Sequence, residues 1–175
     1  SLVASLIANN GIDATEKWAH RFVGNFARKP EGNDRAQIMA VANGEADVAV
    51  ANSYYIGLML SGKKGEEQQA AARKVELHFP GQDGRGAHIN VSGAGLMKNA
   101  PNAGNAVKFI EFLLSEEAQS HIVNNTYEFP MLEGVAPSDL IAQFGSGFKE
   151  DQTSVASYGE FNPEAVKLMD RVGWQ

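Results

Sequence analysis

A short apolar run that leads directly into two tyrosines constrains the fold more than any other stretch of this sequence. Residues 48–51 (Val-Ala-Val-Ala) favour extended structure, are too few for a helix and are bounded by turn-forming residues, so we expect a short buried strand. Asn52 carries a side-chain oxygen suited to cap a new helix, which would begin with Tyr54 and Tyr55. In open α/β sheets, ligands bind beyond the carboxyl ends of the strands. The sequence therefore predicts that the two phenols lie at a binding site.

Helical and short extended patterns alternate along the chain. The expected strand at 48–51 follows a helix expected over residues 35–43, and further strands are expected at 75–79 and 87–92. A strand, a helix and a returning strand in this order are typical of parallel β-α-β winding. With no internal repeat, the pattern predicts the α/β class.

Two helix starts and one aromatic stripe are specific enough to be checked. Asp13 is expected to cap the second helix, on which Trp18, Phe22 and Phe26 recur every four residues as a buried stripe. The last helix is expected to begin near residue 162, with Pro163 in its first turn, after a region that is mostly loop.

Composition and charge exclude several classes of protein. The 175 residues carry a net charge of −6, which argues against a nucleic-acid-binding surface. No apolar run of about 18 residues occurs, so no membrane-spanning helix is expected. The absence of cysteine removes disulfides, thiolate metal sites and cysteine nucleophiles, and the four histidines are scattered without a His-x-x-x-His pair. The lack of an Arg- or Lys-led apolar leader is typical of a mature form, a fragment or a cytosolic protein.

The tyrosine pair has two interpretations. A phenol ionises near pH ~10, but a hard trivalent cation displaces the proton and holds the phenolate. Ferric iron favours such hard anionic oxygen ligands. Neighbours in a regular helix point about 100° apart, yet at a strand-to-helix corner both phenols can converge. On the dipeptide alone, a half-buried aromatic pair at a helix start is the simpler interpretation.

Five blocks of the sequence carry a family resemblance. They are residues 29–37, 42–55, 88–95, 114–119 and 125–130. In order and spacing they resemble the periplasmic ferric-ion-binding proteins of bacteria, the transferrin-like components of iron(III) ABC transporters. The Asn-x-Tyr-Tyr element that ends the second block distinguishes the ferric binders from other binding proteins of this fold. The resemblance covers nearly the whole chain.

The resemblance implies a fold, a function and a set of site residues. The fold is that of type II periplasmic binding proteins, and the function is capture of Fe(III) in the periplasm for delivery to an ABC transporter permease. Tyr54 and Tyr55 match the family's ferric ligands. Asn52 and Asn33 match residues that hold a synergistic anion such as phosphate or carbonate. The alternative is a relative that binds a small organic solute or anion without metal, through the same asparagines.

An enzyme is not expected. The sequence contains no Ser-His-Asp order with a nucleophile elbow, no phosphate loop and no metal-hydrolase motif. The leading hypothesis is therefore binding and delivery without catalysis.

The resemblance also implies that this chain is only the carboxyl-terminal part of such a protein. Residues 1–83 and 136–175 would belong to the carboxyl lobe. Residues 84–135 would cross the hinge and pack on an amino-terminal lobe, which would supply the remaining metal ligands. Without that lobe we expect an exposed apolar face on this chain.

Overall fold

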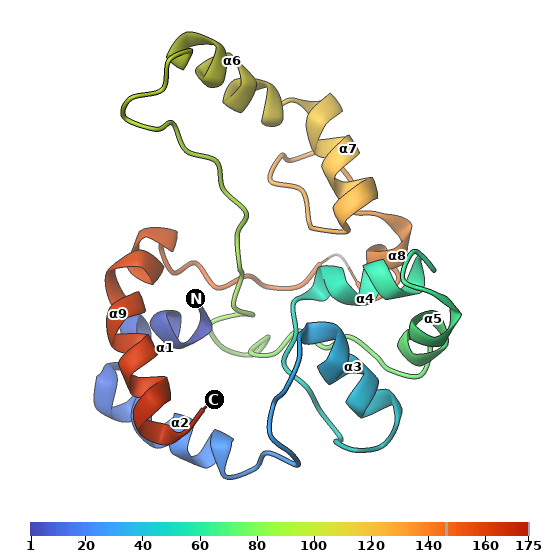
Figure 1. Cartoon of the computed structure of the whole chain (residues 1–175), viewed down its shortest axis with the longest axis vertical. Coiled ribbons are helices and arrows are strands. Elements are labelled where there is room, and N and C mark those ends of the chain that lie inside the picture. The colour runs from blue at the N-terminus through green and yellow to red at the C-terminus, as the bar shows by residue number, and fades with distance from the viewer. Residues whose placement is uncertain (146, 175) are drawn as a thin grey trace.

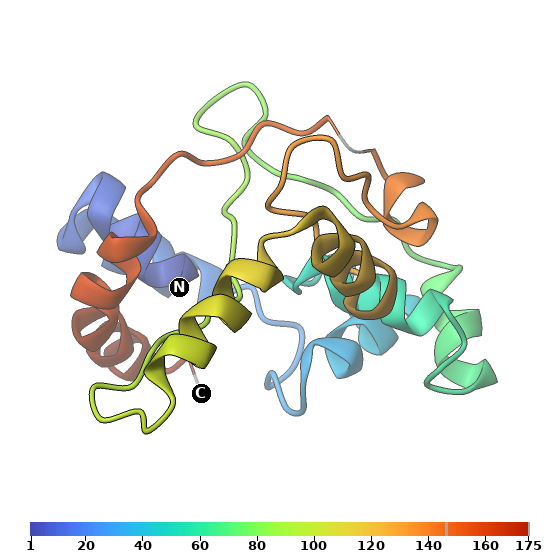
Figure 2. The same cartoon turned by 90° about the horizontal axis from the view of Figure 1, so that it is seen from above.

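The structure, a computed structural model, describes residues 1–145 and 147–174, and these ranges are mostly helical (Figure 1). The helices in them are, in order, α1 (Leu2–Asn10), α2 (Ile12–Val23), α3 (Asp34–Ala42), α4 (Ser53–Leu60), α5 (Glu66–Ala72), α6 (Ala103–Leu113), α7 (Glu116–Thr126), α8 (Asp139–Ala142) and α9 (Val155–Val172). Helices α1, α2 and α9 pack together as a first helical group, and α3, α4, α5 and α8 as a second. Helices α6 and α7 form an arm that lies above both groups in Figure 1 and passes in front of them when the molecule is seen from above in Figure 2.

The first helical group is built on small and branched residues of α1 and α9. Its buried side chains include Val3, Ile7 and Leu168. The aromatic stripe of α2 extends this core, because Trp18 stacks on Phe22 with ring centroids 5.0 Å apart. The predicted packing role of the stripe is confirmed, although its rings are half-buried rather than fully buried.

The second helical group has its own core and carries the tyrosine pair. Met59 and Ile141 are fully buried there, between α4 and α8. Tyr127, the residue after α7, is 4% exposed and packs into this same core. The arm is therefore attached to the second helical group by its carboxyl end.

An extended stretch connects the groups to the arm. Residues 87–98, here called the crossing segment, rise from between the two helical groups to the arm (Figure 1). At its start Ala87 forms an isolated parallel bridge with Glu150. Next to this bridge the buried carboxylate of Asp151 accepts hydrogen bonds from Arg85 Nε (2.9 Å) and Ser5 Oγ (3.3 Å). Two chain connections are thus held together where they pass between the groups.

The predicted strand at residues 48–51 is not formed. Apart from the single bridge, no residue in the ranges 1–145 and 147–174 is in a β-ladder, so the segments at 75–79 and 87–92 are unpaired as well. Val48 is 82% exposed and Val50 is 56% exposed, against the expected burial. The physical reason is that a strand needs a neighbouring strand for its backbone hydrogen bonds and a packed layer for its side chains. Nothing within the described ranges supplies either.

Two helix starts differ from those expected. Helix α2 begins after Gly11, which has a φ of 79°, and Asp13 lies in the first turn without capping it. Helix α9 begins at Val155, so Pro163 lies inside the helix rather than in its first turn. Tyr158 and Phe161, which precede the proline, pack onto the first core, and this burial favours the longer helix. Among the described residues, no helix is long and apolar enough to cross a membrane.

Candidate functional site

The two tyrosines lie together at the start of α4. Asn52 is the N-cap residue, as predicted, and its carbonyl accepts a hydrogen bond from Tyr55 N at 3.1 Å. The rings of Tyr54 and Tyr55 have centroids 4.4 Å apart and an interplanar angle of 39°. Both side chains are half-buried. Adjacent residues in the first turn thus present two phenols to one region of space.

The surroundings favour the protonated form of the first phenol. Burial raises the pKa of Tyr54 to about 12, with further contributions from a hydrogen bond to Tyr55 and from the negative charges of Asp34 and Glu128. At neutral pH the group is therefore a phenol, not a phenolate. A ligand that needs the phenolate must displace the proton, which a hard, highly charged cation can do.

Asn52 joins the tyrosine helix to α3. Its backbone N and its Nδ2 donate to Asp34 Oδ1, at 2.8 Å and 3.2 Å. Its Oδ1 accepts from Asn90 Nδ2 of the crossing segment at 3.3 Å. The expected side-chain cap by Asn52 is therefore wrong, because its amide is directed to Asp34 and Asn90 instead of back to its own helix.

Asn33 lies at the start of α3, beside Asp34. Its Oδ1 accepts from Ala36 N at 3.3 Å, so Asn33 is the N-cap residue of this helix. Through the bond between Asp34 and Asn52, the first turns of α3 and α4 lie side by side. The two asparagines named from the sequence therefore belong to one region of the surface.

Four polar residues of this region were not identified as site residues from the sequence. They are Asp34, Asn90, Ser92 and Glu128. Ser92 Oγ donates to Glu128 Oε1 at 2.9 Å, next to the bond between Asn90 and Asn52. The spacing of Asn90 and Ser92 was the available signal, because residues two apart in an extended segment lie on the same side. Asp34 and Glu128 gave no local signal, because only the fold brings them to the tyrosines.

Histidine and carboxylate clusters do not offer a second metal site in the described part of the chain. There, no group of three or more His, Asp or Glu residues lies close enough to hold an ion. His88 has its Nε2 3.1 Å from Ser1 Oγ and its ring centroid 5.1 Å from that of Tyr158, so its ring packs and hydrogen-bonds within the fold. The oxygen-rich region around Tyr54 and Tyr55 is therefore the candidate site.

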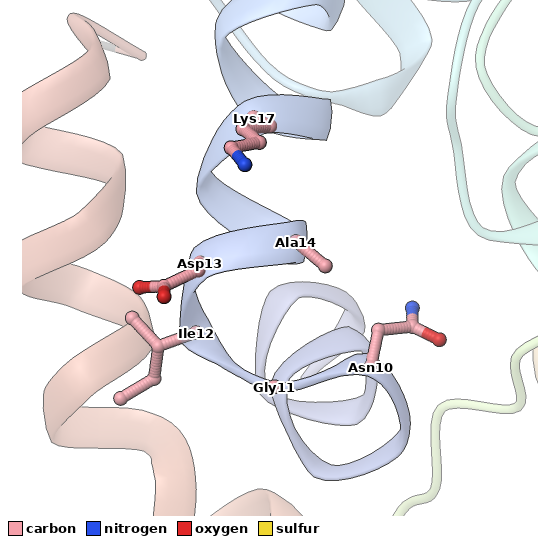
Figure 3. A pocket seen from close by; sticks show the side chains of 6 residues that line it. All are labelled: Asn10, Gly11, Ile12, Asp13, Ala14 and Lys17. Carbon is pink, nitrogen blue, oxygen red and sulfur yellow. The ribbon is translucent and has the colours of Figure 1, made fainter.

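A separate hollow lies at the corner between α1 and α2. It is lined by Asn10, Gly11, Ile12, Asp13, Ala14 and Lys17 and is open to solvent. Its polar side chains point in different directions, with Asp13 near α9 and Asn10 on the opposite side (Figure 3). Because these groups do not converge, the hollow has no features of a specific site.

Comparison with known proteins assigns the family. Residues 5–120 match the family model described as bacterial extracellular solute-binding protein. The chain belongs to this family. As a solute-binding protein it is 50% identical, over all of its 175 residues, to iron uptake protein A1 of a Synechocystis species. It is 28% identical, over 98% of its length, to the major ferric iron-binding protein of Neisseria meningitidis.

Solved structures extend this assignment to the fold. The Trichodesmium protein IdiA (FutA), in complex with iron and citrate ligands, superposes with a TM-score of 0.94 at 51% identity, over 99% of this chain and 54% of that one. A ferric binding protein from Campylobacter jejuni gives a TM-score of 0.93 at 42% identity. This solute-binding protein therefore shares the fold of about half of a type II, transferrin-like ferric-binding protein. It spans about half the length of its curated relatives, 48% of the Synechocystis protein and 49% of the Neisseria protein.

Proposed function

We propose that this chain is the carboxyl-terminal part of a periplasmic protein that captures Fe(III) through Tyr54 and Tyr55 and delivers it to an ABC importer. The observation that carries the proposal is the convergence of the two rings, 4.4 Å apart, at the start of α4. The names of the relatives, an iron uptake protein and a ferric iron-binding protein, support iron as the cargo. The activity is binding, release and recognition by the permease, without a chemical reaction.

The chemistry of the site favours the ferric over the ferrous ion. Binding of Fe(III) by two phenols releases two protons and leaves one positive charge on the metal–phenolate unit. The raised pKa of Tyr54, about 12, means that its phenol holds its proton firmly. Cations that are weak Lewis acids therefore displace this proton poorly. A trivalent ion with a preference for hard oxygen ligands meets the requirement best.

Asn33 and Asn52 are proposed to hold a synergistic anion, phosphate or carbonate, beside the metal. Asn33 precedes the nine-residue helix α3, and Asn52 precedes the eight-residue helix α4. The amino ends of helices favour the binding of anions. An anion there would neutralise remaining charge and fill coordination positions. A solute-binding protein for a small anion without metal would use the same groups, and the titration below separates the two functions.

The exposed apolar surfaces support a second half of the molecule. Residues 84–135 are proposed to cross the hinge and pack on an amino-terminal lobe, while residues 1–83 and 136–175 form the carboxyl lobe. Helix α6 buries none of its residues, and Phe109 and Phe112 on it are exposed. Val48 and Val50 are exposed as well. The curated relative from Synechocystis is about twice as long as this chain. A paired strand beside residues 48–51 would complete the α/β sheet, and the second lobe would add the missing metal ligands.

A ferric titration tests the proposal. The chain is titrated with Fe(III) from a soluble chelate at about pH 7, and the visible charge-transfer absorbance of phenolate-bound iron is followed. We expect a band in the parent chain that disappears in the double variant Tyr54→Phe/Tyr55→Phe. Tyr158→Phe is the matched control, because Tyr158 lies in the core of the first helical group, and this variant should keep the band.

A chimera decides the case in which the chain alone binds weakly. It joins the amino-terminal half of the Synechocystis relative to this chain, which restores a second set of ligands. A band in the chimera that is lost with the double variant supports the proposal. No band in either protein, or a band that survives the loss of both tyrosines, would refute ferric binding at this pair.

A further inference from the structure

The end of the arm carries one carboxylate, that of Glu128, which is bound by the same extended segment that contacts Asn52. Tyr127, directly after α7, has a φ of 65°, in the left-handed region that side chains rarely adopt. The Tyr127 side chain packs against α4. The contact is so close that a Cβ added to Gly57 would lie 2.7 Å from Tyr127 Cβ. This contact holds the unusual backbone conformation and sets the direction in which the chain leaves at Glu128.

The crossing segment holds that carboxylate in place. Ser92 Oγ donates to Glu128 Oε1 at 2.9 Å. Two residues earlier, Asn90 Nδ2 donates to Asn52 Oδ1 at 3.3 Å. Because Asn90 and Ser92 share one side of the extended segment, this segment contacts both Glu128 and Asn52, the residue two before Tyr54.

Negative charge at this position has a use once the metal is bound. Before an anion binds, ferric iron on two phenolates retains one positive charge, and the nearby Asp34 already accepts two hydrogen bonds from Asn52. Glu128 accepts one from Ser92, which lies two residues from the Asn90 that contacts Asn52. Outer groups that hydrogen-bond and complement a metal site commonly tune its affinity.

We propose that Glu128 is a positioning residue for ferric iron: aimed by Tyr127 and held by Ser92, its carboxylate stabilises the positively charged metal–phenolate unit on Tyr54 and Tyr55. The role is electrostatic, through the phenolates, and Glu128 is not a ligand of the ion. Ser92 makes the crossing segment part of the site, since movement of that segment moves the carboxylate. This inference rests on the proposed ferric function.

The test compares Glu128→Gln with Glu111→Gln, in this chain and in the chimera. Glu111 is an exposed carboxylate on α6 of the same arm, so both variants remove one negative charge. Ferric affinity is measured by competition with citrate, and release by transfer to a strong chelator. We expect Glu128→Gln to weaken binding by about tenfold, to speed release and to shift the charge-transfer band, with Glu111→Gln unchanged.

Two further variants separate charge from packing. Glu128→Asp keeps the charge and should recover most of the lost affinity. Ser92→Ala should cause a smaller loss, and adding it to Glu128→Gln should cause no further loss, because Ser92 acts through the carboxylate.

Three results would overturn the inference while leaving the ferric function intact. They are equal affinity in Glu128→Gln and Glu111→Gln, an Asp variant as weak as the Gln variant, or additive losses from Ser92→Ala and Glu128→Gln. Absence of the band in the parent chain and in the chimera would instead overturn the ferric function, and this inference with it.

Discussion

The contact between α4 and Tyr127 predicts the effect of a single methyl group. In Gly57→Ala the new Cβ would lie 2.7 Å from Tyr127 Cβ, 3.0 Å from Tyr127 Cγ and 2.9 Å from Ile141 Cδ1. The two Tyr127 atoms lie next to a backbone held at a φ of 65°, and both neighbours are buried, so neither can move cheaply. Overpacking of this kind costs about 1–3 kcal/mol, and the upper half of that range is expected here.

Helix propensity acts in the opposite direction and has to be subtracted. Replacing glycine by alanine inside a helix stabilises it by about 1 kcal/mol. The net expected loss for Gly57→Ala is therefore about 1–2 kcal/mol, taken from the two terms together. For a chain of this size, each kcal/mol corresponds to about 2–4 °C in Tm, so the variant should unfold about 2–8 °C lower.

Gly159→Ala on α9 is the matched control. Nothing lies within 4 Å of a Cβ built at this glycine, so only the propensity gain should remain. Its Tm should rise by about 2–4 °C. Thermal unfolding followed by circular dichroism measures both variants. If Gly57→Ala stabilised the protein as much as Gly159→Ala does, the argument that Tyr127 is held rigidly against α4 would be refuted.

Two further predictions concern pH and helix capping. Burial lowers the pKa of His88 in the folded protein and so favours its neutral form. The stability that this group contributes is present above its unfolded pKa of about 6.5 and should be lost as the pH falls through its lower folded pKa. The pKa of Asp151 is also lowered, because hydrogen bonds from Thr153 and the charge of Arg85 outweigh its burial, so a second loss should follow below pH ~3.9. Melting temperatures measured against pH should show both losses of stability. His88→Gln should remove the loss at the higher pH, and Asp151→Asn should remove the loss at the lower pH. Variants with the same pH profile as the parent would contradict these assignments. Asn33→Ala should lower the free energy of unfolding by about 1 kcal/mol, because the hydrogen bond from Ala36 N to the Asn33 side chain is lost. Asn33→Ser should retain most of this stability. If both variants matched the parent in urea unfolding, the cap would contribute nothing to stability.

Local signals were enough to predict most helices of this chain. The helix expected over residues 35–43 is formed as α3, and Asn33 before it accepts a backbone hydrogen bond from the residue three positions on. These features succeed because a helix satisfies its own backbone within a few residues, so its ends depend on neighbouring sequence. The start of α9 was missed because burial of Tyr158 and Phe161 is a tertiary effect that outweighs the proline signal.

The strands could not be predicted reliably for the opposite reason. Residues 48–51 have the right composition, but their hydrogen bonds and their burial depend on other segments of polypeptide. Within the described ranges such segments are lacking, and Val48 and Val50 are exposed. The sequence pattern and the observed conformation differ because a strand is not a local structure.

The sequence by itself determined the residue types of the candidate site and the helix that presents them. Tyr54 and Tyr55 are adjacent, and Asn52 before them predicted the start of the helix that carries them. Only the tertiary structure decided what surrounds them. Asp34, Asn90 and Glu128 come from α3, the crossing segment and the end of the arm. The hydrogen bonds that hold them in this region join residues 18 to 38 positions apart in sequence. Charge and hydrogen bonding act through space, so these partners become visible only when the chain is folded.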